Sequence, residues 1–300
     1  MRWAGWGELP QALCEELADA GLDVRETYDL VIRALAEDLP GEDTAGVAAF
    51  PGDVSGIADF GARESGTVAG LAIAELVFWC LMESALVVDE RVPDGTRVSA
   101  GDVVMSVRGP VHELLAGERT ALNMASHLSG VATATAAWVD AVAGTKARIL
   151  DTRKTLPGLR SFQKYAVRCG GGVNHRFSLS DMAMVKDNHV IAAGGVVAAY
   201  EGVKRRWPGL PVEVEVTDLD QLRDLLDAGC ERILLDNMTD EEMASAVQIT
   251  DGHATLEASG GLTLERARDV AETGVDFISV GALTHSVKVF DLGMDLREAR

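Results

Sequence analysis

The chain has 300 residues, 47% of them hydrophobic and 25% charged, and its 27 basic and 47 acidic side chains give a formal net charge of −20. These values describe an ordinary globular chain with enough residues for a sizeable core in one or two domains. The strong negative charge argues against nucleic acid as a partner, because nucleic-acid binding needs a broad basic surface.

Membrane insertion, export and disulfide bonding are not expected. The sequence contains no run of the roughly 18 to 20 apolar residues that a membrane-crossing helix needs, and its start, MRWAGWGELPQALCEEL, lacks the order of a signal peptide. We therefore expect a cytoplasmic protein. Its cysteines, Cys14, Cys80, Cys169 and Cys230, have no CxxC or metal-type spacing and are expected to be buried or incidental thiols.

The N-terminal part predicts a small mixed domain and a long helix. Helical spacing of apolar residues predicts a helix over 24–36, which EDLPGEDTAG then ends. Short apolar pieces between 54 and 107, separated by Gly, Pro and Asp, predict a sheet-rich region with a helix around 71–83. A helix over 111–142 follows, and its small residues indicate close helix packing.

The C-terminal part predicts a parallel sheet. Short apolar runs alternate with helical patterns, and they lie at 148–150, 183–185, 211–216, 232–236, 254–259 and 276–280. This alternation predicts right-handed crossovers, in a sheet that is either open or closed. The strand VEVEV favours a barrel, because Glu213 and Glu215 share one face that would line its interior while the valines meet outer helices.

Polar residues follow the predicted strands where ligands of such sheets bind, beyond the carboxyl ends. They are Asp151 to Lys154, Lys186 to His189, Glu215, Asp236 with Asn237, Ser259 to Gly261, and Gly281 with Thr284 and His285. Structural explanations are open for several: Asp236 as a helix cap, 259–261 as a turn, Glu213 as a structural residue and His189 as a loop residue. For Lys154 and Lys186 we favour function, because burying an ammonium group at a barrel mouth is costly without an anion.

These residues divide by charge into three kinds of site. The cations Arg153, Lys154, His175, Arg176 and Lys186 suit carboxylates. The acids Glu215 and Asp236 suit Mg²⁺, held directly or through water or substrate. The glycine-rich ends at 259–261 and 281 let backbone N–H groups approach a phosphate. Within the basic stretch from Asp151 to Arg176, Arg160, Lys164 and Arg168 are expected to face solvent or a phosphate.

Seven segments, in this order, resemble the quinolinate phosphoribosyltransferase family. They are GERTALNMASHLSG, DTRKTLPGLRSFQKYAVRCGGGVNHR, LSDMAMVKDNH, VEVEV, ILLDNM, EASGGL and VGALTHS. The resemblance covers about residues 30–295. Two features depart from the family pattern: an N-terminal extension, and Pro40 where a glycine is usual.

The resemblance implies a two-domain α/β fold and a shared active site. It implies an N-terminal α/β sandwich domain at 1–118, on which 287–300 packs, and an open parallel α/β barrel at 119–286. It also implies a homodimer, or a hexamer built from such dimers, in which Arg119 reaches the neighbour's site. Arg153, Lys154, His175, Arg176 and Lys186 match the quinolinate-binding cations, and Lys154, Glu215 and Asp236 the catalytic residues. Ser259, Gly260, Gly281 and His285 match the phosphate-binding end.

The activity implied is Mg²⁺-dependent phosphoribosyl transfer from 5-phosphoribosyl-1-pyrophosphate to quinolinate. The products are nicotinate mononucleotide, pyrophosphate and CO₂, in the biosynthesis of NAD. Three alternatives stay open: a phosphoribosyltransferase of the same scaffold acting on another pyridine carboxylate, an aldolase using Lys186 as a Schiff base, and a non-catalytic anion-binding barrel.

Overall fold

The computed structural model describes residues 3–49 and 54–298, which form two compact units. The first unit comprises Met1–Ala134, Ser161–Gly171 and Val287–Arg300, and the second comprises Thr135–Arg160 and Gly172–Ser286. The boundary thus lies after residue 134, whereas the sequence placed it after residue 118. That expected boundary falls inside one continuous helix, α5 (Val111–Ala141).

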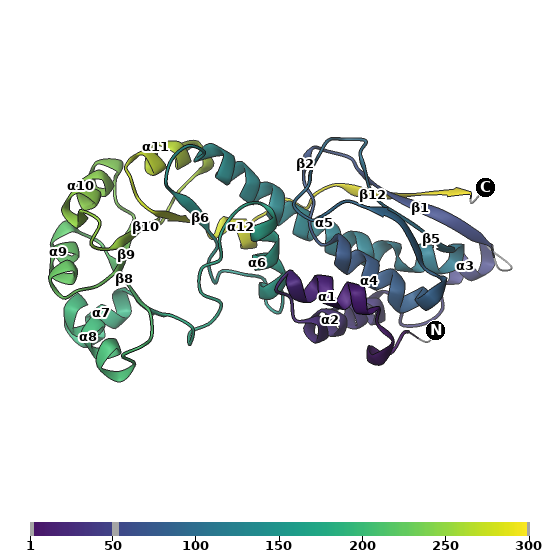
Figure 1. Cartoon of the computed structure of the whole chain (residues 1–300), viewed down its shortest axis with the longest axis horizontal. Helices are drawn as coiled ribbons and strands as arrows, with labels where there is room; N and C mark the ends of the chain where they lie inside the picture. The colour runs from purple at the N-terminus through teal and green to yellow at the C-terminus, as the bar shows by residue number, and fades with distance from the viewer. Residues whose placement is uncertain (1–2, 50–53, 299–300) are drawn as a thin grey trace. The chain divides into compact units, whose positions relative to one another are not determined.

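A four-stranded antiparallel sheet forms the centre of the first unit. Its strands are β1 (Ser55–Ala62), β3 (Val87–Arg91), β5 (Val103–Pro110) and β12 (Leu292–Glu298), in the order β12-β1-β5-β3. The C-terminal segment is therefore a strand of the first unit, because β12 pairs along β1 from Ala62↔Leu292 to Gly56↔Glu298 (Figure 1). A second, short pair joins β2 (Gly66–Thr67) to β4 (Arg97–Val98).

The helices of the first unit confirm the three predicted from apolar spacing. They are α2 (Val24–Asp38), α4 (Leu71–Met82) and α5, each within two residues of its predicted bounds. The N–H of Glu26 donates to the Asp23 side chain, which caps α2. The sequence did not predict α1 (Gln11–Asp19), α3 (Thr44–Ala49), or the short 3₁₀ turns η1 (Trp6–Glu8) and η2 (Glu83–Ala85). Among them α3 is six residues long and buries only Gly46, which leaves little periodicity to detect.

The basic helix α6 (Arg160–Cys169) packs in the first unit from Ser161 onward, which corrects one expectation. Lys164 was expected to face solvent or a phosphate, but it is fully buried, as are Phe162 and Val167 of the same helix. The Tyr165 hydroxyl on this helix donates to Asp94 at 2.6 Å. Such burial could not be read from charge, because the long aliphatic stem of lysine packs like an apolar side chain.

Six parallel strands form the sheet of the second unit, as predicted. They are β6 (Arg148–Leu150), β7 (Ala183–Val185), β8 (Val212–Val216), β9 (Arg232–Asp236), β10 (Thr255–Ser259) and β11 (Phe277–Ser279). Their order is β6-β11-β10-β9-β8-β7, so β6 and β7 are the two edges of an open sheet. This order brings all six carboxyl ends to one side.

Helices cover the outer face of this sheet, where Figure 1 shows α8 to α11 following the arc of the strands. They are α8 (Val196–Arg206), α9 (Leu219–Asp227), α10 (Asp240–Thr250) and α11 (Ala267–Glu272), which follows the turn η3 (Leu264–Arg266). Two short helices, α7 (Asp187–Ala193) and α12 (Ala282–His285), follow β7 and β11. The valines of β8 are buried, and Glu213 is buried on the opposite face, as the alternation of VEVEV predicted.

Two further expectations concern the membrane and the cysteines. Within residues 3–49 and 54–298, no helix is long and apolar enough to cross a membrane. All four cysteines are free. Burial raises the pKa of the Cys80 thiol to about 12 and that of Cys230 to about 11, so these thiols are poor nucleophiles at neutral pH.

Close packing of α5 depends on its small residues, as the sequence indicated. A Cβ atom at Gly130 would lie 2.3 Å from the backbone oxygen of Lys288, and one at Gly117 would lie 3.0 Å from the ring of Phe78. The Phe290 N–H donates to the Ser126 carbonyl at 3.1 Å beside this contact. Gly130 therefore fixes how closely the chain preceding β12 approaches α5.

We expect Gly130→Ala to lower the free energy of unfolding. The clash with the Lys288 backbone should cost roughly 1–3 kcal/mol. This cost exceeds the stability that alanine adds through its higher helix propensity. Urea unfolding followed by circular dichroism measures this. The matched control is Gly202→Ala in α8, where an added Cβ meets no atom within 4 Å and stability should rise slightly. Equal effects of the two substitutions would contradict this account of the packing.

Candidate active site

A pocket of about 300 Å³ lies in the second unit at the carboxyl ends of the strands. Its lining residues are Thr152, Arg153, Lys154, His175, Arg176, Met184, Lys186, Leu234, Glu257, Ser259 and Ser279. Six of the predicted site residues are among them: Arg153, Lys154, His175, Arg176, Lys186 and Ser259. The structure therefore brings all five predicted cations of the second unit to one cavity.

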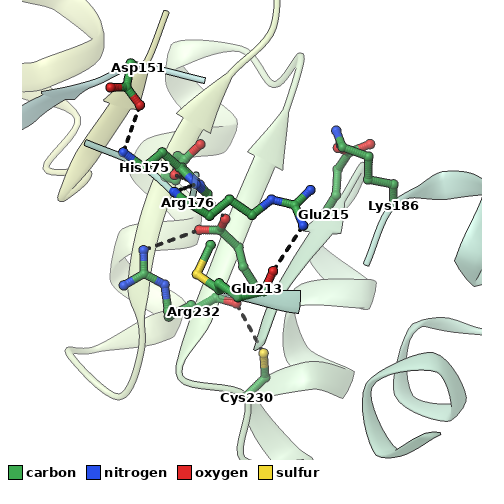
Figure 2. Close-up of polar contacts among 10 residues, drawn as sticks. Asp151, His175, Arg176, Lys186, Glu213, Glu215, Cys230 and Arg232 are labelled. Carbon is green, nitrogen blue, oxygen red and sulfur yellow. Dashed lines mark hydrogen bonds and ion pairs between the residues drawn. The ribbon is translucent and has the colours of Figure 1, made fainter. Parts of the chain in front are cut away.

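Asp151 connects the two halves of the basic stretch. Its fully buried carboxylate accepts the His175 N–H at 2.9 Å and the Asn174 side-chain N–H at 2.6 Å. A parallel bridge between Leu150 and Val173 extends this attachment. The loop after Gly172 thus folds back onto the end of β6, where Figure 2 shows His175 beside Asp151. His175 and Arg176 line the same pocket as Arg153.

Arg153 and Arg176 converge on the pocket with little compensation for their charge. Burial, and then the neighbouring charge of Arg153, lower the pKa of Arg176. The buried Nε of Arg153 has no hydrogen-bond partner, while Nη1 of Arg176 donates to the Met182 carbonyl at 3.0 Å. Two guanidinium groups held together in this way favour a bound anion, and their planar shape suits a carboxylate.

Lys154 and Lys186 are exposed, so the argument from a buried ammonium group was wrong for both. Both line the pocket nevertheless. The carbonyl of Lys154 accepts the Thr284 hydroxyl at 2.8 Å, and its side chain passes so close to Gly281 that a Cβ there would lie 2.9 Å from the Lys154 Cδ. Lys186 donates to Glu215 at 2.8 Å. A half-exposed, ion-paired lysine is a poor candidate for a Schiff base, which needs a desolvated amine.

The acids Glu215 and Asp236 lie at the ends of adjacent strands. Glu215 pairs in register with Leu234 on β9, two residues before Asp236. Asp236 is not the cap of the helix that follows, because Thr239 caps α10 and forms a capping box with Glu242. Asp236 accepts the Asn237 side-chain N–H at 3.0 Å. Two partly exposed carboxylates on neighbouring strand ends fit a hard cation such as Mg²⁺.

The glycine-rich end of β10 has a conformation that needs glycine. Gly260 has φ +94°, and a Cβ atom there would lie 2.4 Å from the Asn237 side-chain oxygen. Asn237 itself has φ 55°, and its N–H donates to the Ser259 carbonyl at 2.9 Å. This tight crossing brings Ser259 and Gly260 beside Asp236. Across the sheet, a Cβ at Gly281 would lie 3.2 Å from the ring of His285, which is exposed.

Both ring nitrogens of His175 contact groups of the protein itself. The sequence led us to expect that His175 would bind a carboxylate of the substrate. Its Nε2 lies 2.8 Å from Glu213 and 3.2 Å from Glu257, both buried. Its Nδ1 accepts the backbone N–H of Arg176 at 2.7 Å. Burial lowers the pKa of His175, but the hydrogen bond to Glu213 and then the proximity of Glu257 outweigh it and raise the pKa to about 9.

The same three residues form a group of potential metal ligands in the described part of the chain, with donor atoms within 4.8 Å of one another. They do not fit a metal ion. Because Nδ1 accepts a backbone N–H, the ring proton is on Nε2, the nitrogen that faces the two carboxylates. A protonated nitrogen has no lone pair to coordinate a metal.

Sequence reasoning missed four residues of the pocket: Met184, Leu234, Glu257 and Ser279. One signal for Glu257 was present. It alternates with Ser259 on β10 as Glu213 does with Glu215 on β8, so the period of two places it on the interior face. Met184, Leu234 and Ser279 belong to strands too short or too apolar to show such a pattern.

Arg119 lies in the first unit, on α5. Its side chain is 63% exposed and reaches Glu118 only at 3.8 Å. It is thus an accessible cation on a rigid helix, separate from the residues that line the pocket of the second unit.

Comparisons with known proteins give one consistent family. The model of the quinolinate phosphoribosyl transferase N-terminal domain matches residues 38–129, and that of the C-terminal domain matches residues 131–295. The nicotinate-nucleotide pyrophosphorylase [carboxylating] of Mycobacterium leprae is 48% identical over 289 residues, which are 93% of this chain and 100% of that protein. A probable nicotinate-nucleotide pyrophosphorylase [carboxylating] of Bacillus subtilis is 40% identical over 87% of this chain and 90% of its own length.

Solved structures agree in fold along nearly the whole chain. NadC from Streptococcus pyogenes superposes with a TM-score of 0.89 at 38% identity, covering 93% of this chain and 99% of that one. The nicotinate-nucleotide pyrophosphorylase from Francisella tularensis gives 0.88 at 36% identity, covering 92% and 98%. With both domain models matched and relatives this similar over their full length, the chain belongs to the quinolinate phosphoribosyl transferase family.

Proposed function

We propose that this chain transfers the phosphoribosyl group of 5-phosphoribosyl-1-pyrophosphate to quinolinate and releases nicotinate mononucleotide, pyrophosphate and CO₂, in the biosynthesis of NAD. The observation that carries the proposal is a cationic pocket next to two strand ends that carry carboxylates, one of which is paired with the pocket residue Lys186. Arg153 and Arg176 converge beside Lys154 and Lys186, while Glu215 and Asp236 end the adjacent strands β8 and β9. The family membership of the chain supports it.

The cations are proposed to hold the two carboxylates of quinolinate. The bidentate geometry of Arg153 and Arg176 suits them, and Lys186 adds a charge that Glu215 already orients at 2.8 Å. This grip fixes the pyridine nitrogen toward the sugar, which saves the entropy of bringing two reactants together. His175 contributes by positioning Arg176, whose backbone N–H it accepts.

The acids are proposed to stabilise the sugar as the leaving group departs. Positive charge develops on the ribose at that stage, and the carboxylates of Glu215 and Asp236 are already in place to stabilise it. Lys154, whose backbone carbonyl accepts the Thr284 hydroxyl and whose side chain passes Gly281, is proposed to contact the pyrophosphate. Ser259, Gly260, Gly281 and His285 are proposed to bind the phosphate groups. Mg²⁺, held by Glu215 and Asp236 directly or through water or substrate, would neutralise the leaving group.

Loss of CO₂ then depends mostly on the substrate. A positively charged ring nitrogen next to the 2-carboxylate stabilises the electron pair that decarboxylation leaves on ring carbon C2, so no organic cofactor is needed. The protein must not over-stabilise the carboxylate that leaves, because only differential stabilisation of the transition state raises the rate.

We further propose a cytoplasmic homodimer in which the partner's Arg119 completes the quinolinate site.

The direct test is incubation of the protein with quinolinate, 5-phosphoribosyl-1-pyrophosphate and Mg²⁺. We expect equal amounts of nicotinate mononucleotide, pyrophosphate and CO₂, no reaction in EDTA, and recovery when Mg²⁺ is returned. Nicotinate in place of quinolinate is the control for substrate choice, and it should react poorly because it lacks the 2-carboxylate. Faster reaction with nicotinate would assign the site to another pyridine carboxylate, and ligand binding without product would indicate a non-catalytic barrel.

Arg176→Ala should weaken quinolinate binding by about 10- to 100-fold. One charged hydrogen bond is worth roughly 1.5–3 kcal/mol, and a carboxylate left without its partner loses that much. Isothermal titration calorimetry measures the dissociation constant. Arg205→Ala is the control, because Arg205 is an exposed arginine of α8 away from the pocket residues. Unchanged affinity in the Arg176 variant would remove this residue from the carboxylate site.

Mixing two inactive variants tests whether sites are shared between subunits. Lys154→Ala should nearly abolish turnover while the protein stays folded, and Arg119→Ala should weaken quinolinate binding. If the partner's Arg119 completes the site, mixed dimers contain one site with both residues intact, so activity should rise above that of either variant alone. Steady-state assays before and after subunit exchange measure this. Exchange without recovery of activity would show that Arg119 acts within its own subunit or not at all.

A further inference from the structure

A buried acidic pair beneath the pocket has no part in the reaction as described so far. Glu213 on β8 and Glu257 on β10 are 1% and 2% exposed, and both approach Nε2 of His175. The Nε2–H hydrogen bond goes to Glu213 at 2.8 Å. Glu257 Oε2 is buried and lies 3.2 Å from Nε2, but it forms no well-aligned hydrogen bond with the residues that the structure describes. Two carboxylates this close and this deep cannot both be ionised without compensation.

The number of protons in this cluster follows from its geometry. A doubly protonated His175 with two carboxylates has the same net charge, −1, as a singly protonated His175 with one carboxylate and one carboxylic acid. The second arrangement fits the structure, because the Arg176 N–H points at Nδ1 and leaves no room for a proton there. Burial, and then the charge of Glu213, raise the pKa of Glu257 above its usual range, although the proximity of His175 and Ser279 acts to lower it.

Glu257 is the carboxyl group that holds the proton. Glu213 has a donor at each of its oxygens, because Oε2 accepts the His175 hydrogen bond and Oε1 lies 3.8 Å from the Arg232 guanidinium (Figure 2). Glu257 has the oxygen without a well-aligned hydrogen bond among the described residues, and it is also a lining residue of the pocket. The structure thus presents a buried carboxylic acid at the floor of a cavity whose walls are cationic.

We propose that Glu257 is the general acid that protonates ring carbon C2 after CO₂ leaves, an inference that rests on the proposed function. The bond between C2 and its carboxylate breaks, and its electron pair stays on C2 while CO₂ departs. That pair then takes the proton of Glu257, which becomes a carboxylate. Solvent returns a proton to Glu257 after the product leaves. The step needs no oxidant, reductant or further reactant.

Glu257 is better suited to this step than the cations around it. Lys154, Lys186 and the arginines are needed in their charged form to hold carboxylates and phosphates, and they are far weaker acids than a carboxyl group. A protonated carboxyl is neutral, so it can lie near the departing carboxylate without stabilising it as a cation would. Burial keeps Glu257 protonated until the reaction creates a base beside it.

The test is Glu257→Gln, measured in a single turnover with enzyme in excess over quinolinate labelled in its 2-carboxylate. Pyrophosphate, labelled CO₂ and nicotinate mononucleotide are quantified separately. We expect pyrophosphate release within about threefold of the wild-type rate, but nicotinate mononucleotide formed at least about 100-fold more slowly, with the phosphoribosylated diacid accumulating. The urea midpoint and quinolinate affinity should stay unchanged, because an amide replaces a neutral acid of the same size. Glu272→Gln, the same change at an exposed carboxyl on α11, is the matched control.

Each outcome separates this inference from the proposed function. A wild-type protein that makes neither pyrophosphate nor mononucleotide would refute the proposed function. An active wild-type protein whose Glu257→Gln variant makes mononucleotide at the normal rate would overturn the inference, and so would equal slowing of both steps. If the variant does not fold, Glu257→Asp decides the matter: the shorter acid should slow mononucleotide formation more than pyrophosphate release, and equal slowing would again overturn the role of Glu257.

Discussion

The buried carboxylate of Asp151 is the interaction on which the geometry of the site depends. It lies at the end of the edge strand β6 and accepts hydrogen bonds from both Asn174 and the His175 backbone. The bridge at Val173 and the hydrogen bond between His175 and Glu213 on β8 also attach this loop to the sheet. Asp151 thus holds the segment that carries His175 and Arg176 against the end of β6, although Asp151 itself is not a lining residue of the pocket.

The site combines opposite charges in layers. At the pocket surface, Arg153 and Arg176 repel each other, which a bound diacid would relieve. Beneath them, Glu213, Glu257 and His175 hold a shared proton in a buried cluster. At the neighbouring strand ends, Glu215 and Asp236 provide carboxylates next to the glycine turn at Gly260. Because the charges are fixed by short strands and tight turns, little reorganisation is needed when a charged substrate reacts, and preorganisation of this kind is a main source of catalysis.

The spacing of apolar residues predicted the second unit well, because its strands and helices are regular and helices connect most of its parallel strands. All six strands lie within two residues of their predicted positions, and helices follow several of them, as the alternation predicted. The first unit was predicted less well. Its sheet takes strands from both ends of the chain, and β12 pairs with β1 across more than two hundred residues, so periodicity could not reveal it. The buried Lys164 was misplaced for a related reason, since charge does not reveal which face of a helix is covered.

The sequence by itself determined which residue types end each strand, and therefore that cations, acids and glycines would gather at one edge of a parallel sheet. It also carried the order of motifs that identifies the family. Only the tertiary structure decided what those residues do to one another. It showed that Lys154 and Lys186 are exposed and that Thr239, not Asp236, caps α10. It also showed that both ring nitrogens of His175 form hydrogen bonds within the protein. Protonation and hydrogen bonding depend on distances between strands that are far apart in the chain, and such distances exist only once the sheet has formed.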